Sequence, residues 1–115
     1  MKKFYDKLVK TRHHLHQHPE LSSQEYKTTA FLKRYLQDLG IKILDSGLET
    51  GLIAEIGQGK PVIALRADID ALPILEKTGL PYASQNPGVM HACGHDFHQT
   101  SLLGAAELLK AMEED

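Results

Sequence analysis

Two helices are predicted by the spacing of apolar residues in the first forty positions. Over residues 3–16 the apolar side chains recur at near-helical intervals, and Pro19 should end this helix because it pushes the preceding residue out of the helical region. Ser22 and Glu25 can form a capping box for a second helix, which Gly40 should terminate. The apolar face of this helix comprises Tyr26, Ala30, Phe31, Leu36 and Leu39.

After Gly40 the period shortens, which predicts strands. Residues 41–44 alternate, residues 51–57 (GLIAEIG) form a short apolar segment, and residues 61–69 (PVIALRADI) begin with a continuous apolar run typical of a strand covered on both faces. A final helix is expected from about Phe97, with Asp96 as its N-cap. The order helix, helix, strand, strand, strand, helix predicts an α/β sandwich, in which ligands gather where strands end and helices begin.

Composition and charge exclude several classes of partner. The 115 residues are 42% hydrophobic, enough for one small domain. With a formal net charge of −2 and a pI near 6.4, no basic surface for nucleic acid is expected. We expect no membrane association either, because the charged N-terminus lacks a signal-peptide apolar region and no window reaches the roughly 18 apolar residues of a membrane span. A lone cysteine favours a reducing, cytoplasmic location.

The stretch MHACGHDFH, residues 90–98, concentrates the candidate chemistry. Cys93 and His95 are two positions apart, so they could share one metal ion only if the chain turns at Gly94. A thiolate and an imidazole suit zinc and similar divalent metals. The spacing alone does not separate a metal site from a buried structural cysteine beside a hydrogen-bonded loop histidine, and it assigns no role to His91 or His98.

Two other groups of polar residues are candidate metal ligands, but each also has a purely structural interpretation. Asp68 and Asp70 end an apolar strand, where an acidic pair serves either a metal site or a turn. Four histidines precede Pro19, and we interpret them as surface or helix-terminus residues because cationic groups suit that end of a helix. They are His13, His14, His16 and His18.

Four segments in this order resemble one family of enzymes: RHHLHQHPELSSQE, RADIDALPI, TGLPYAS and GVMHACGHDFHQTSLLGAA. The family is that of the amidohydrolases that include hippurate hydrolase, indole-acetyl-amino-acid hydrolase and N-acetyldiaminopimelate deacetylase. They form a branch of the dinuclear metallopeptidases related to aminoacylase and bacterial carboxypeptidases. The resemblance implies the first part of a three-layer α/β catalytic domain over residues 1–115, with the lid and dimerisation domain and the rest of the catalytic domain absent.

The resemblance also implies roles for particular residues. Cys93 would bridge two divalent metal ions, zinc or manganese, and His95 would bind one of them. Asp70 matches the catalytic-site aspartate that orients a metal ligand, whereas Asp68 stands where the wider group has a ligand histidine, so its role stays open.

The implied reaction is hydrolysis of an N-acyl amino acid by a metal-activated water. The family's general-base glutamate and further ligands come later than residue 115. We therefore expect this part alone to be inactive and to hold metal weakly or not at all. The alternative is a non-catalytic module that forms a homo-oligomer or binds a protein partner through exposed apolar surface. A redox thiol is less favoured, because there is no second cysteine to resolve it.

Overall fold

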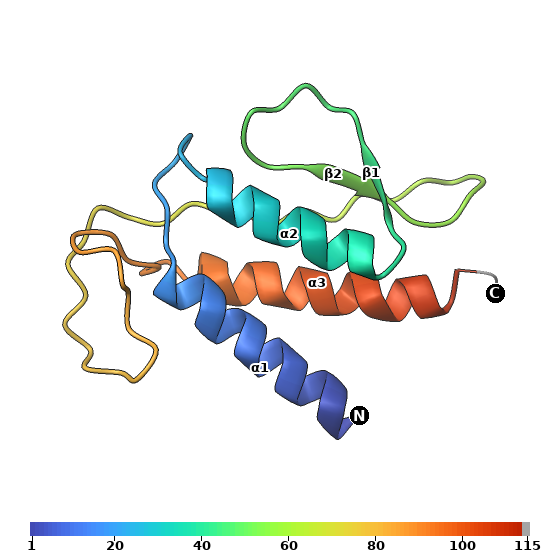
Figure 1. Ribbon diagram of the computed structural model, residues 1–115. Coiled ribbons are helices and arrows are strands. Elements are labelled where there is room, and N and C mark those ends of the chain that lie inside the picture. Colours follow the sequence, from blue (N-terminus) through green and yellow to red (C-terminus); the bar gives the residue numbers. More distant parts are fainter. Residues whose placement is uncertain (114–115) are drawn as a thin grey trace.

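Three helices and one β-hairpin make up the regular structure of residues 1–113, the part of the chain that the computed structural model describes (Figure 1). The elements are α1 (Lys2–Gln17), α2 (Tyr26–Asp38), β1 (Lys42–Leu44), β2 (Ile53–Glu55) and α3 (His95–Ala111). The strands are antiparallel, in a register that pairs Ile43 with Ala54. The predicted α/β class is confirmed. No helix in this part of the chain is long and apolar enough to cross a membrane.

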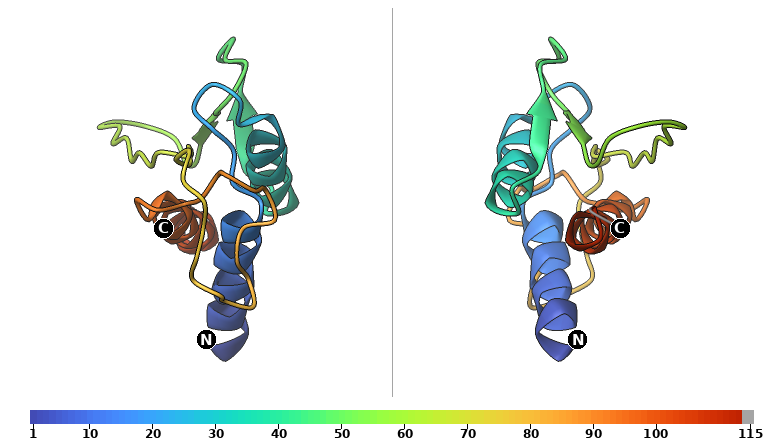
Figure 2. Two further views of the ribbon diagram at one scale, coloured as in Figure 1. Left: turned by 90° about the vertical axis from the view of Figure 1, so that its left-hand side faces the viewer. Right: turned by 90° about the vertical axis from the view of Figure 1, so that its right-hand side faces the viewer.

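Helix α3 lies at the centre of the fold. It packs against both α1 and α2, while β1 packs against α2. Figures 1 and 2 show the hairpin beyond α2 on one side of the molecule and α1 crossing α3 on the other. The core between these elements is made by Leu32, Leu36, Ile41 and Leu103, all at least nine-tenths buried. Burying their apolar surface fixes the position of α3, and with it the residues at its N-terminus.

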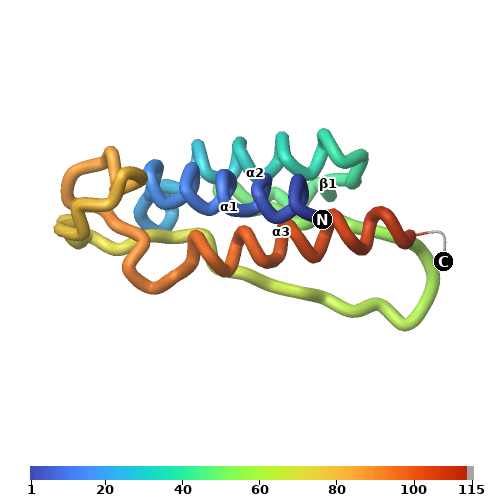
Figure 3. Tube along the Cα trace, turned by 90° about the horizontal axis from the view of Figure 1, so that it is seen from below, coloured from blue at the N-terminus to red at the C-terminus, as the bar shows by residue number. Residues whose placement is uncertain are grey.

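The third predicted strand is absent from residues 1–113, so that part of the expected element order is wrong. Residues 61–69 form no strand, and Val62 and Ile63 are 84% and 82% exposed. The physical reason is that a strand needs a partner for its backbone groups, and none of the described segments pairs with this one. Figure 3 shows the segment that follows β2 running along α3 toward the N-terminal end of that helix.

The helix ends confirm some local signals and correct others. Helix α1 ends at Gln17, and His18 leaves the helical region, as Pro19 predicted. The capping box is wrong: Glu25 takes the N-cap position of α2 without a side-chain hydrogen bond. Instead, the carboxylate of Glu20 accepts hydrogen bonds from the backbone N–H groups of Thr28 (2.6 Å) and Lys27 (3.2 Å). A negative charge at the positive end of the helix dipole serves the same purpose.

Candidate metal centre

Backbone hydrogen bonds bring the two candidate segments of the site together. Leu72 and Met90 exchange two of them, each 2.9 Å long, in an antiparallel bridge. Next to this bridge, the N–H of Ala71 donates to the carbonyl oxygen of Glu20 at 2.8 Å. The bridge closes the 73–89 loop at its base. It therefore sets Asp70, just before the loop, beside the chain that leads into α3.

His95 contacts Asp70, the residue that the resemblance gives as orienting a metal ligand. Its Nδ1 lies 2.8 Å from the backbone carbonyl oxygen of Asp70 and 3.0 Å from the Oδ1 of the same residue. Both atoms accept, so Nδ1 carries the proton and donates, which leaves the lone pair of Nε2 free to bind a metal. Asp68, whose role the sequence left open, lies on the Nε2 side. Its Oδ2 is 3.8 Å from that nitrogen, while its other oxygen pairs with Arg66.

Cys93 is exposed and lies just before α3. Between it and His95, Gly94 adopts a left-handed conformation with φ of 80° and forms the N-cap of the helix. This confirms the predicted turn at Gly94, the residue type that takes this conformation without steric cost. It also corrects the expectation for Asp96, which lies inside the first turn of α3 instead of capping it.

The donor set fits a divalent metal in kind but not in number. Cysteine sulfur and histidine nitrogen are zinc ligands, and both residue types lie at the start of α3. Within residues 1–113, however, no three histidine, cysteine, aspartate or glutamate side chains converge as a metal-binding group. The described residues thus supply part of a coordination sphere.

His91, two residues before Cys93, is not available as a ligand from solvent. It is buried, and neither ring nitrogen has a hydrogen-bond partner among the described residues. Burial lowers its pKa to about 4, with the charges of His16 and His95 acting in the same direction. His91 is therefore a neutral imidazole at physiological pH. By contrast, His98 is exposed, with its ring 6.0 Å from that of His95.

A buried cluster of contacts between basic side chains and carboxylates next to the site was missed by the sequence reasoning. His16, expected at the surface, is only 3% exposed and contacts the carboxylates of both Asp96 and Glu76. Arg12 donates from Nε to the same Asp96 oxygen at 3.0 Å. Burial alone would raise the pKa of Asp96, but the contacts with His16 and Arg12 outweigh it and lower that pKa. The helical spacing of Arg12 and His16, four residues apart, was the available signal.

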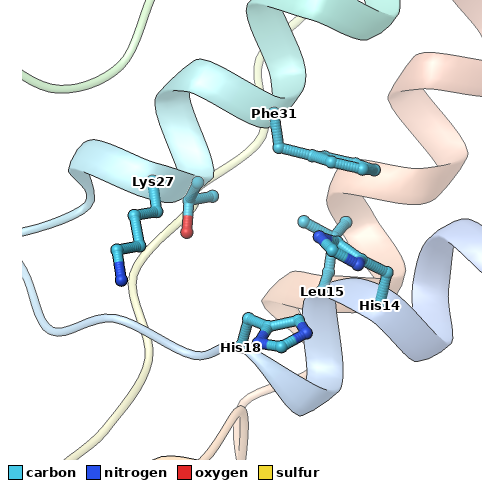
Figure 4. Close-up of a pocket in the computed structure, with 6 residues that line it drawn as sticks. His14, Leu15, His18, Lys27 and Phe31 are labelled. Atoms are coloured by element: carbon cyan, nitrogen blue, oxygen red, sulfur yellow. The ribbon is translucent and has the colours of Figure 1, made fainter.

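The remaining histidines lie apart from Cys93 and His95. His13 stacks on Tyr82, with the ring centroids 3.8 Å apart. His14 stacks on Phe31 at 4.3 Å and faces a pocket of about 290 Å³ between α1 and α2 (Figure 4). The residues that line it are His14, Leu15, His18, Lys27, Thr28 and Phe31. This pocket adds nothing to the metal centre.

Comparison with known proteins finds similar sequences over most of the chain. Residues 64–115 match Peptidase family M20/M25/M40. The chain is 61% identical over 109 residues to N-acetyl-L-cysteine deacetylase of Bacillus subtilis, and 56% identical over 111 residues to an N-acetylcysteine deacetylase of the same organism. These matches cover 93% and 94% of the chain but 26% and 29% of the relatives. The chain thus spans little more than a quarter of the length of these curated relatives.

A solved structure extends the likeness to three dimensions. The crystal structure of a Bacillus subtilis protein, described as a dinuclear metal binding peptidase from the M20 family, superposes with a TM-score of 0.94 at 52% sequence identity. The match covers 98% of this chain and 33% of that one. In fold and sequence, the chain is similar to proteins of peptidase family M20/M25/M40.

Proposed function

We propose that residues 1–115 form the N-terminal part of the catalytic domain of a metal-dependent amidohydrolase that cleaves N-acyl amino acids. The observation that carries the proposal is the orientation of His95: Asp70 engages its Nδ1 and leaves Nε2 free. The exposed thiol of Cys93 precedes it across the left-handed turn at Gly94. The names of the relatives support an N-acetylated amino acid, N-acetylcysteine above all, as the substrate.

In this proposal Cys93 and His95 hold two divalent ions, zinc or manganese, together with ligands supplied from outside residues 1–115. The bound ions supply a Lewis acid for the amide carbonyl and an activated water. Asp70 keeps His95 in the tautomer that binds through Nε2. A glutamate outside this part of the chain acts as the general base. Because Cys93 must remain a free thiol, a reducing compartment such as the cytoplasm suits the site.

Zinc titration of the 115-residue chain by calorimetry, beside Cys93→Ser and His95→Ala, tests the proposal. The parent chain should bind weakly, and each substitution should abolish binding. Asp70→Asn should weaken binding about tenfold, because it loosens the support of a ligand histidine. His98→Gln is the matched control, since that exposed histidine lies on the same turn of α3. Binding that survives both Cys93→Ser and His95→Ala would overturn the assignment.

One observation favours the alternative of a self-associating module. Val62, Ile63 and Leu65 form an exposed apolar run, 84%, 82% and 60% exposed, on a segment with no strand partner among residues 1–113. Such a run is suited to pairing with another chain. Sedimentation of the parent chain beside Ile63→Lys decides this alternative: a defined oligomer that the substitution dissociates would support it, and a monomer would exclude it.

A further inference from the structure

His16 lies between two carboxylates and reaches both with its ring. Its Nδ1 is 2.8 Å from Oδ2 of Asp96, and its Nε2 is 2.9 Å from Oε1 of Glu76. All three side chains are at least 97% buried. Because both partners are carboxylate oxygens, which accept hydrogen bonds, both ring nitrogens must donate. The geometry therefore calls for an imidazole that carries a proton on each nitrogen.

The two carboxylates belong to the two segments that frame the metal centre. Asp96 follows His95 directly in the first turn of α3, and it also accepts from Arg12. Glu76 lies in the 73–89 loop, where it accepts from the N–H of Ser84 at 2.9 Å and from the hydroxyl of Thr78. These hydrogen bonds and that from His16 outweigh burial and lower the pKa of Glu76.

Further contacts tie the same loop to the end of α1. The N–H of Gln85 donates to the carbonyl oxygen of Gln17 at 2.8 Å, and the side-chain amide of Asn86 donates to that of Pro19 at 3.2 Å. Helix α1 thus holds the loop through its backbone and, through His16, holds the loop and α3 at once. Arg12 also spans the two, donating to Asp96 and to the hydroxyl of Tyr82 at 3.3 Å, but His16 is the side chain that joins the two buried carboxylates.

We propose that His16 is a positioning residue of the metal centre: a doubly protonated imidazole that locks Asp96 and Glu76 together and so fixes His95 against Asp70. Loss of either hydrogen bond would remove one donor from a buried carboxylate and free the first turn of α3 to shift. The effect of His16 on metal binding rests on the proposed function, whereas its hydrogen bonds to Asp96 and Glu76 can be tested in the metal-free chain.

Nitrogen NMR of the isotope-labelled, metal-free chain tests the ring state first. We expect two long-lived ring N–H signals for His16 near neutral pH, and a single ring proton would overturn the proposal. In His16→Gln, the carbonyl end of the amide must face one carboxylate. The backbone amide signals of Asp70 and of residues 94–98 should then move. The matched control is His18→Gln, an exposed histidine at the same end of α1, which should leave them in place.

Zinc affinity gives the readout that a purely structural role would not change. Folded His16→Gln should bind about tenfold more weakly than the parent chain, and His18→Gln should bind equally well. Equal affinity and unmoved amide signals in His16→Gln would refute the role. Should His16→Gln fail to fold, Glu76→Gln removes one acceptor charge at constant shape and is expected to move the same amide signals. If the parent chain binds no zinc, the metal site needs the ligands from outside residues 1–115, while the ring protons and amide signals still decide the role of His16.

Discussion

The buried His91 should make the stability of this chain depend on pH in a range where carboxylates have little effect. Its pKa is about 4 in the folded chain, against 6.5 for an ordinary histidine, because burial disfavours the charged form. Above pH 6.5 the ring is neutral in both states and has no effect. As the pH falls below that value, the unfolded chain takes up a proton that the folded chain cannot accept. This effect of His91 therefore lowers stability between pH 6.5 and about pH 4 and does not change further below.

The size of this loss follows from the two pKa values. Between about pH 7.5 and about pH 5, a group shifted from 6.5 to about 4 lowers the free energy of unfolding by about 2 kcal/mol. Glu76 and Asp96 also have lowered pKa values, but their ordinary values are 4.5 and 3.8, so their contributions are lost at lower pH. Burial also lowers the pKa of His14, which contributes with the same sign.

Urea denaturation of the metal-free chain at several pH values measures the effect. His91→Phe keeps an aromatic ring in the buried site and removes two nitrogens that have no partner among the described residues. We expect it to abolish about 2 kcal/mol of pH dependence without loss of stability at about pH 7.5. His98→Gln should retain the full slope, and His14→Gln isolates the smaller contribution. An unchanged slope in His91→Phe, or a His91 ring that titrates near 6.5 by NMR, would refute the reasoning.

Two further predictions concern the start of α3. Asp96→Asn should lower the free energy of unfolding by about 3 kcal/mol, because it leaves buried His16 and half-buried Arg12 without their carboxylate. Urea denaturation measures this, and a loss below about 1 kcal/mol would contradict the ion-pair geometry. Gly94→Ala should cost about 1 kcal/mol in thermal unfolding through backbone strain at φ of 80°. An added Cβ there meets no atom within 4 Å, so a much larger loss would require a different cause.

The helices were predictable because their signals are local. The apolar spacing of α1 and α2 and the stops at Pro19 and Gly40 each depend on residues within a few positions of one another. The predicted capping box was wrong because the start of α2 is held by a residue outside that local motif. The carboxylate that holds the N-terminus of α2 comes from Glu20, eight residues before Thr28. A motif of four residues does not include a carboxylate that reaches the N–H groups of the helix from farther along the chain.

The segment 61–69 shows the limit of apolar patterns for strands. Its sequence predicts a strand covered on both faces, but a strand exists only when a second one pairs with it. No such partner lies within residues 1–113. Helix α3 formed as predicted, because its hydrogen bonds close within its own backbone.

The site divides in the same way between local and distant causes. Asp70 and His95 were candidates from the family motif, and the structure brings these two residues together. The support for this contact comes from His16, which lies 80 residues from Asp96 and 60 from Glu76 in the chain. Buried charges at such separations are stable only when paired, so the fold must bring them together before they contribute anything. The geometry at His95 is therefore set as much by α1 as by its own motif, and a substitution on α1 should alter the metal centre without touching a ligand.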